Sequence, residues 1–484
     1  MNRRSFVIGY WLFAISLSAC TPKPPDQQFL DDAMNAVGGR ERIEQVKTIA
    51  IEGSGVNYNL GQDMKPEAST QQFAISGYLR KIDVEHGRQR IEQTRTPKFP
   101  YFQGQQPQTQ VLSIDGDVAF NETANGAARL AAAGEKDRRM EFFHHPVTAL
   151  RAAIGPQTTV SNVRTSGNVR QADFALRDLQ WTMTIDAAGV PLSISSKTAH
   201  PNLGDVVMTT TFAQYEDVNG LKLPRAISGK VDDFTTYEIS ASKQFVDADL
   251  GNIAAPASVS QPAATAPPNV VVTPVGKGVW FMAGQSHHSV LVEFSDHLML
   301  IEAPQSEART LAVIAKAKDT VKNKPLTELV TTHHHFDHTA GMRAAISEGL
   351  TVITQAGNRA WVDAMARRPH TIQPDTLAKN VSRLNIDTVD DEKEIKDQSM
   401  TVQLFHVAGN PHSDTMLMAY IPSLRVLVEV DAFSPGAAVN PYAANLLEHV
   451  TRRNLRVDRI VPLHGAIVPF GELVKVAAPA PKGN

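Results

Sequence analysis

The segment Thr332-His333-His334-His335-Phe336-Asp337-His338 determines how this chain is interpreted. The stretch 327–332 predicts a strand, so His333 and His335, two residues apart at its end, should project in one direction. Asp337 and His338 come next, where the chain turns toward a helix. Imidazole and carboxylate groups are ligands for zinc and for other divalent metals. The segment therefore predicts a metal site that could serve two adjacent ions.

A histidine-rich tract is the alternative interpretation of this segment. Such a tract would not be followed by Gly341 and an amphipathic helix, as happens here. Three further polar positions come after short apolar stretches in the second half of the chain. They are His412 within 409–415, Asp431 at the end of 426–431, and His464 before Gly465.

In order and surroundings, these positions resemble the motif elements of the metallo-β-lactamase-fold superfamily, and the segment 332–341 resembles its signature. The resemblance covers about residues 269–470, somewhat less than half of the chain. It implies an αβ/βα four-layer sandwich, preceded here by a different domain. It also implies a metal-dependent hydrolase.

The resemblance implies roles for individual residues. His333, His335 and His412 would hold one metal ion, and Asp337, His338 and His464 the second, with Asp431 bridging both. The cofactor would be two divalent ions, zinc before others. A hydroxide shared by the two ions would attack a carbonyl carbon, because zinc lowers the pKa of bound water to about 7. Asp337 would also orient that hydroxide.

The chain departs from the family pattern at two places. Glu302 stands where the family carries an aspartate that supports a metal ligand, so we expect Glu302 to support a ligand as well. Asp431 stands where the best-known zinc β-lactamases carry cysteine. An aspartate at this position resembles instead the ligand pattern of glyoxalases, of lactonases and of one β-lactamase subgroup. His287 and His288 either line the site or lie in a solvated loop. We expect His334 to point away from the metals and His406 to be structural.

Three functions are compatible with this pattern. The first is hydrolysis of a small-molecule ester, lactone, thioester or amide. The second is a di-iron redox reaction on the same fold, but diiron flavoproteins of the superfamily carry glutamate where this chain has His335. The third is a ligand-binding lipoprotein with an inactive metal domain, which the complete ligand set disfavours. A net charge of -3 with dispersed Lys and Arg predicts no nucleic-acid partner.

The 484 residues predict more than one domain. Residues 31–250 show mainly period-two alternation, which predicts a mostly antiparallel β domain with a helix near its start and one helix at 140–154. Residues 251–268 are rich in Ala, Pro and Ser and predict a linker. In 269–478, strand patterns alternate with helix patterns, as expected of an α/β domain.

The N-terminus has the features of an export signal. Arg3 and Arg4 precede an apolar run, and Leu17-Ser18-Ala19-Cys20 resembles the lipobox of bacterial lipoproteins. Residues 1–20 would then be a signal peptide, Cys20 would be lipidated, and 21–30 would be a tether. Thr21 after the cysteine favours the outer membrane, facing the periplasm. The two arginines leave the general and twin-arginine routes open.

The lipobox generates a first prediction. Because Cys20 is the single cysteine of the chain, Cys20→Ser should release the protein from the membrane fraction or block its processing. Immunoblots of membrane and soluble fractions from cells that express the wild type or the variant would check this. A variant that is processed normally and stays with the membranes would place the anchor elsewhere.

Overall fold

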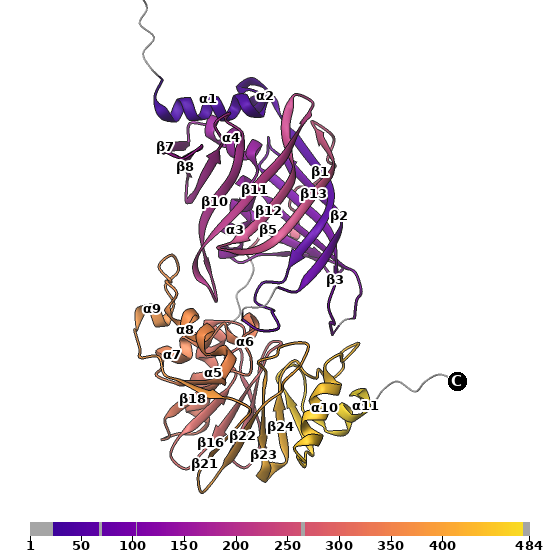
Figure 1. The fold of residues 1–484 in the computed structure, drawn as a ribbon, viewed down its shortest axis with the longest axis vertical. Helices are drawn as coiled ribbons and strands as arrows, with labels where there is room; N and C mark the ends of the chain where they lie inside the picture. The colour runs from indigo at the N-terminus through magenta and orange to yellow at the C-terminus, as the bar shows by residue number, and fades with distance from the viewer. Residues whose placement is uncertain (1–22, 67–69, 103, 263–266, 478–484) are drawn as a thin grey trace, which may run out of the picture.

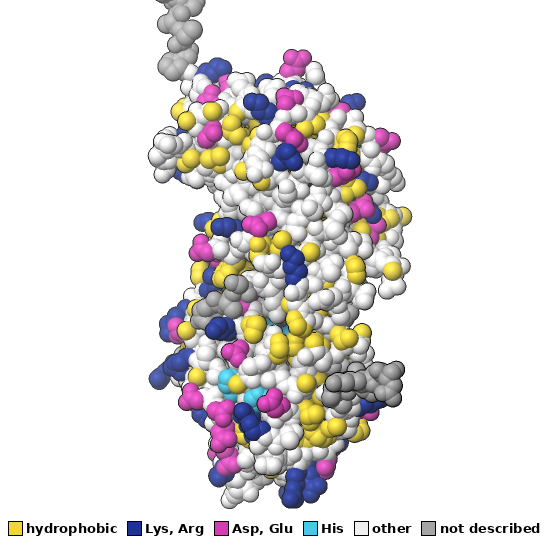
Figure 2. Space-filling view, turned by 45° about the vertical axis from the view of Figure 1, so that its right-hand side comes forward, with side chains coloured by type: hydrophobic (Ala, Val, Ile, Leu, Met, Phe, Trp, Pro, Cys, Tyr) yellow, Lys and Arg dark blue, Asp and Glu magenta, His cyan; other side chains and the backbone are white. Residues whose placement is uncertain are grey.

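The computed structural model describes residues 23–66, 70–102, 104–262 and 267–477 and shows two lobes, one above the other (Figure 1). The expected signal peptide, with Cys20, lies outside the described residues. No helix in the described part of the chain is both long enough and apolar enough to cross a membrane. On the face drawn in Figure 2, Lys and Arg side chains are interspersed with Asp and Glu side chains over both lobes.

The N-terminal lobe is built on a 13-stranded sheet in which all neighbouring strands are antiparallel. Strands follow chain order across the sheet, except that the first strand pairs with the last in the interior of the sheet. The strands are β1 (Thr48–Tyr58), β2 (Gln72–Asp83), β3 (Arg88–Pro97), β4 (Gln108–Asp115), β5 (Val118–Thr123), β6 (Gly126–Arg129), β7 (Thr158–Ser166), β8 (Val169–Leu176), β9 (Leu179–Ile185), β10 (Pro191–His200), β11 (Gly204–Val218), β12 (Leu221–Val231) and β13 (Phe234–Val246).

Alternation along these strands produces the core of the lobe. In β9, Leu179, Trp181, Met183 and Ile185 are buried and the residues between them are more exposed. These side chains join a cluster that includes apolar residues of the helices α1 (Pro25–Val37), α2 (Arg40–Gln45), α3 (Ala132–Phe143) and α4 (Pro146–Ile154). The prediction of a mostly antiparallel β domain is therefore confirmed.

Two local predictions in this lobe were wrong. Residues 25–30 are not a tether, because α1 begins at Pro25 and buries Phe29 and Leu30; proline suits the first helical turn, where its missing N–H is not needed. The helix expected at 140–154 is two helices, with Pro146 starting the second. The intervening His144 is buried, with its ring nitrogens 2.9 Å from Thr210 Oγ1 and from Ser196 Oγ.

The C-terminal lobe contains a 7-stranded and a 6-stranded sheet with an apolar core between them. The first sheet comprises β14 (Val271–Gly276), β15 (Val279–Ala283), β16 (Ser289–Glu293), β17 (Leu298–Ile301), β18 (Leu326–Val330), β19 (Thr351–Gln355) and β20 (Ile386–Val389). The second comprises β21 (Glu392–Lys396), β22 (Thr401–His406), β23 (Leu417–Ile421), β24 (Val426–Glu429), β25 (Arg459–Pro462) and β26 (Val468–Pro469).

Helices cover the outer faces of both sheets, which completes four layers (Figure 1). The helices on the side of the 7-stranded sheet are α5 (Glu307–Thr320), α6 (Phe336–Thr339), α7 (Met342–Ser347), α8 (Arg359–Arg367) and α9 (Thr376–Lys379). Those on the side of the other sheet are α10 (Ala443–Arg452) and α11 (Gly471–Ala477). The predicted αβ/βα sandwich is confirmed.

The two lobes are joined by polar and apolar contacts away from the ligand motifs. The Arg368 side chain forms an ion pair with Asp232 and donates to the carbonyl of Leu203. Asp205 accepts from the backbone N–H of Thr371 at 2.9 Å. Leu203 also belongs to the core cluster of the C-terminal lobe. The lobes therefore share an interface at which apolar surface is buried and charges are partly buried.

The first part of the predicted linker packs against the N-terminal lobe. Ile253 and Val259 are buried, and the backbone N–H of Ala255 donates to Asp115 at 2.9 Å. The short 3-10 helix η1 (Ala257–Val259) lies beside β6, where Arg129 donates to the carbonyl of Ser260. We therefore propose that the connection between domains is shorter than 251–268 and begins at Gln261.

This shorter connection can be tested by limited proteolysis. Elastase should cut between Gln261 and Pro268, where the composition offers little apolar surface to bury, and should spare 251–260, whose backbone is held against the sheet. Mass spectrometry of the fragments from a denaturing gel would locate the cuts. Early cleavage inside 251–260 would contradict the proposed start of the connection.

Candidate metal centre

Most polar residues of the predicted site lie on loops that follow strands of both sheets, and Asp337 and His338 lie on the short helix α6. His333 and His335 follow β18, Asp431 follows β24 and His464 follows β25. Two site carboxylates occupy strained backbone: φ is 72° at Glu302 and 57° at Asp431, in the left-handed region that non-glycine residues rarely adopt. The sharp turns at these positions direct both carboxylates inward from the ends of their strands.

A first group of ligand atoms comes from His333, His335, His412 and Asp431, all of them buried. Their candidate donor atoms lie within 4.8 Å of one another. His412 Nε2 is 3.0 Å and His333 Nε2 is 3.3 Å from the same carboxylate oxygen, Asp431 Oδ2. The spacing and the mixture of nitrogen and oxygen donors fit one divalent ion.

A second group lies beside the first and comprises His287, Asp337, His338 and His464. Asp431 reaches this group as well, because Oδ2 is 3.0 Å from His338 Nε2 and Oδ1 is 2.9 Å from His464 Nε2. A single carboxylate therefore contacts imidazoles of both groups. That is the arrangement required of a residue shared between two adjacent ions.

Unpaired nitrogens support metal binding by the first group. His335 Nδ1 is buried without a hydrogen-bond partner among the described residues, and His333 Nε2 is buried with no hydrogen bond beyond its 3.3 Å approach to Asp431 Oδ2. Leaving buried polar atoms unpaired is costly, and a metal ion would satisfy both. The opposite nitrogen of His335, Nε2, lies 2.8 Å from the backbone carbonyl of Asp63 and can donate its proton there. This contact fixes the tautomer in which Nδ1 is free to bind a metal.

Glu302 occupies the supporting position that the sequence predicts. One carboxylate oxygen accepts from the backbone N–H of Thr332 at 2.6 Å, and the other lies 3.0 Å from His338 Nδ1. Glu302 is fully buried. Its two contacts fix the start of the histidine segment and the orientation of the His338 ring.

Burial and neighbouring charges shift the pKa values of the site residues in different directions. Burial lowers the pKa of His333 to about 3 and that of His335 well below its ordinary value, so both rings are neutral, as metal ligands must be. Burial alone would lower the pKa of His338, but Asp431 and Asp337 raise it well above its ordinary value. Burial alone would raise the pKa of Asp431, but the surrounding histidines hold it well below its usual range.

The N-terminal lobe contributes directly to this site through the loop after β1. Gln62 Nε2 donates to Asp337 Oδ1 at 2.7 Å, and the Gly61 carbonyl accepts from the N–H of Phe336 at 3.1 Å. A Cβ on Gly61 would lie 2.2 Å from the Phe336 ring, so only glycine permits this approach. On the other side, Asp337 Oδ2 is 3.2 Å from His287 Nε2.

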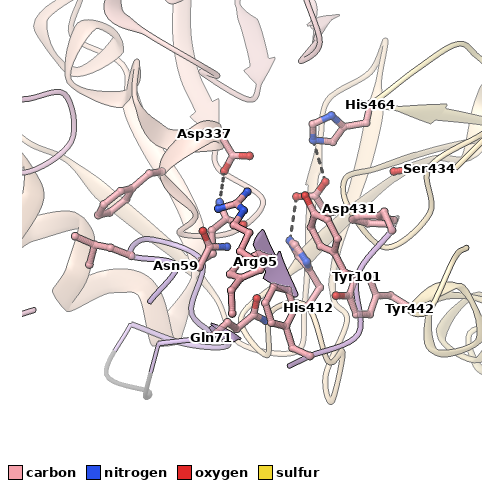
Figure 3. A pocket seen from close by; sticks show the side chains of 16 residues that line it. Asn59, Gln71, Arg95, Tyr101, Asp337, His412, Asp431, Ser434, Tyr442 and His464 are labelled. Atoms are coloured by element: carbon pink, nitrogen blue, oxygen red, sulfur yellow. Dashed lines mark hydrogen bonds and ion pairs between the residues drawn. The ribbon is translucent and has the colours of Figure 1, made fainter. Parts of the chain in front are cut away.

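A cavity of about 520 Å³ opens onto the two groups (Figure 3). Asp337, His412, Asp431 and His464 line its floor, and Tyr442 lines one side. Loops and strand ends of the N-terminal lobe line much of the rest, through Asn59, Leu60, Gln62, Gln71, Phe73, Arg95, Phe99, Tyr101 and Phe102. The volume is in the range of pockets that enclose small molecules.

The structure brings together all seven residues that the sequence pointed to as metal ligands; their role as ligands stays a prediction. His287, for which the sequence left two roles open, lies in the second group. His288 is buried beside Phe281 instead. His334 faces away, with Nδ1 3.3 Å from Thr415 Oγ1, and His406 lies 2.6 Å from the carbonyl of Asp414.

The sequence did not predict the contributions of Gln62 and Asp63 to the site. No local pattern in 59–63 marks contact with residues about 275 positions later.

Comparison with known proteins agrees with this architecture. Residues 283–437 match the family model of the metallo-β-lactamase superfamily. The C-terminal lobe is therefore a metallo-β-lactamase-fold domain. Together with the histidine–aspartate groups, this supports a metal-dependent hydrolase at a general level.

Solved structures similar to this chain include metallo-β-lactamases from Pontibacter korlensis, from Pseudomonas aeruginosa in a mono-zinc form, and from Hirschia baltica. Their identities are 17%, 17% and 18%, and their TM-scores are 0.36, 0.35 and 0.34. Each covers 43% of this chain, and the chain covers 97%, 93% and 96% of them, respectively.

The shared position of Asp431 predicts different metal contents for different variants. Asp431→Asn should lose metal from both groups, because its carboxylate contacts both. Asp337→Asn should keep about one ion, because the first group keeps its three histidines. Glu302→Ala should lose less metal than either aspartate variant, since loss of a contact that supports a ligand costs about 10–100-fold in metal affinity. Elemental analysis of the purified variants would measure this order.

His334→Gln is the matched control. It changes a buried histidine of the same segment that belongs to neither group, so its metal content should equal that of the wild type. Equal metal content in all four variants would show that the assigned roles are wrong.

Proposed function

We propose that this protein is a dinuclear zinc hydrolase that acts on a carbonyl substrate, namely an ester, lactone, thioester or amide. The position of Asp431 carries the proposal, because its two oxygens lie 2.9–3.3 Å from histidines of both groups. Nitrogen and carboxylate donors without cysteine suit zinc. His333, His335 and His412 would hold one ion with Asp431, and Asp337, His338 and His464 the other, with His287 in reach.

When bound, zinc would supply a nucleophile by lowering the pKa of a water molecule and would polarise the substrate carbonyl. The chain itself provides orientation. Burial alone would raise the pKa of Asp337, but His338 and His287 hold it below its usual range. The carboxylate is therefore ionised and can accept a hydrogen bond. Gln62 and His287 hold its two oxygens from opposite lobes. The N-terminal lobe also lines much of the cavity beside this carboxylate.

We also propose that the protein acts at the cell envelope, as a lipoprotein of the outer membrane that faces the periplasm. The basis is the sequence Leu17-Ser18-Ala19-Cys20 followed by Thr21. Two acyl chains on Cys20 would suffice for stable attachment. The substrate would then be a small molecule that reaches the periplasm.

The proposed activity can be tested on the chain from Thr21 onward, loaded with zinc. We expect turnover of at least one member of a panel of aryl esters, lactones, thioesters and β-lactams. Activity should disappear with a chelator and return when zinc is added, and Asp431→Asn should be inactive. A protein with two zinc ions bound and no turnover across the panel would contradict hydrolysis. Hydrolysis that returns only with iron would show that iron, and not zinc, is the metal of the site.

A further inference from the structure

The arginine Arg95, on β3 of the N-terminal lobe, lines the cavity above the histidine–aspartate groups. Figure 3 shows its side chain extending into the cavity, opposite the residues of the C-terminal lobe. No other Lys or Arg among the described residues lines this cavity. A positive charge is therefore fixed at a single place on its wall.

The contacts of Arg95 leave its charge without a counterion. Its Nε donates to Gln108 Oε1 at 2.9 Å, and its Cζ lies 4.3 Å from the centre of the Phe73 ring. Among the described residues, no carboxylate forms an ion pair with it. Arg90, five residues earlier on the same strand, pairs with both Glu92 and Glu122. Burial without a partner lowers the pKa of Arg95, which is the direction expected for a charge removed from water.

These contacts orient the guanidinium without saturating it. The Gln108 contact fixes one edge, and the Phe73 ring covers one face by a cation–π interaction. The two terminal amino groups have no hydrogen-bond partner among the described residues. Together they form the planar fork that matches the two oxygens of a carboxylate.

Aromatic side chains surround this charge. Phe73, Phe99 and Tyr101 contact one another edge to face, with ring centres 5.1–6.2 Å apart. Phe102 packs in the same way on Tyr442 of the C-terminal lobe, at 5.3 Å. All five rings line the cavity. The wall therefore offers apolar surface beside one fixed cation.

We propose that the substrate carries a carboxylate, bound by Arg95, together with an apolar or aromatic portion that lies against the Phe99 and Tyr101 rings. This inference rests on the proposed hydrolase and narrows its substrate class to small anionic esters, lactones, thioesters or amides. It makes Arg95 a residue that determines specificity, and it gives the N-terminal lobe the role of selecting the substrate.

The test compares two aryl esters that differ only in charge. 4-Nitrophenyl hydrogen glutarate carries a carboxylate at the end of its acyl chain, and 4-nitrophenyl pentanoate carries a methyl group there. Rates are corrected for hydrolysis without protein. The zinc-loaded wild type should prefer the anionic ester by at least about tenfold in kcat/KM, the low end for a hydrogen bond to a charged group. Arg95→Met should reduce this ratio to about one, mainly through KM of the anionic ester, and Arg95→Lys should keep part of it.

Lys98→Met is the matched control, because it removes the same charge three residues along the chain from an exposed side chain that does not line the cavity. Its ratio should equal that of the wild type. Metal content and thermal unfolding would show that each variant is folded. A wild type with no preference, or equal loss of preference in Arg95→Met and Lys98→Met, would overturn the role of Arg95 while leaving hydrolysis intact. A wild type that cleaves neither these esters nor the wider panel would count against the proposed function itself.

Discussion

The buried carboxylate of Asp431 is the group on which the rest of the site depends. It contacts four histidines from three separate parts of the chain, and those histidines hold its pKa low although the carboxylate is buried. An ionised group at this depth would be costly without such partners. The same neighbours that stabilise the charge also converge on the space where two cations would lie. The charge of Asp431 that holds the four histidines together is therefore also the charge that would attract the metal ions.

The second constraint is the docking of the two lobes. The ion pair between Arg368 and Asp232 joins the lobes away from the site, and the loop that carries Gln62 and Asp63 joins them at the site. Through that loop, the N-terminal lobe determines the tautomer of His335 and the orientation of Asp337. A metallo-β-lactamase-fold domain alone would lack both contacts and most of the cavity wall. The candidate active site is therefore a property of the whole chain.

Much of the C-terminal lobe could be predicted, because its signals are local. Strand ends followed by His333, Asp431 and His464 show in the sequence as apolar runs with polar residues directly after them. The N-terminal contributions could not be predicted in this way. Arg95 and Gln62 look like ordinary polar residues of a strand and a loop, and only the packing of the lobes turns them toward the cavity. The break between α3 and α4 was missed although Pro146 marks it, because apolar residues continue on both sides.

The pairing of β1 with β13 has a consequence for the order of assembly. These strands are neighbours in the interior of the sheet but are separated by about 190 residues of chain. Such distant pairing makes folding slow, because a long loop must close before the contact forms. During synthesis, β1 can gain its second neighbour only after residues 234–246 have emerged. The loop that follows β1 contacts Asp337 and His335 of the C-terminal lobe, which is synthesised later still. The candidate metal centre would therefore be the last part of the molecule to take its final form.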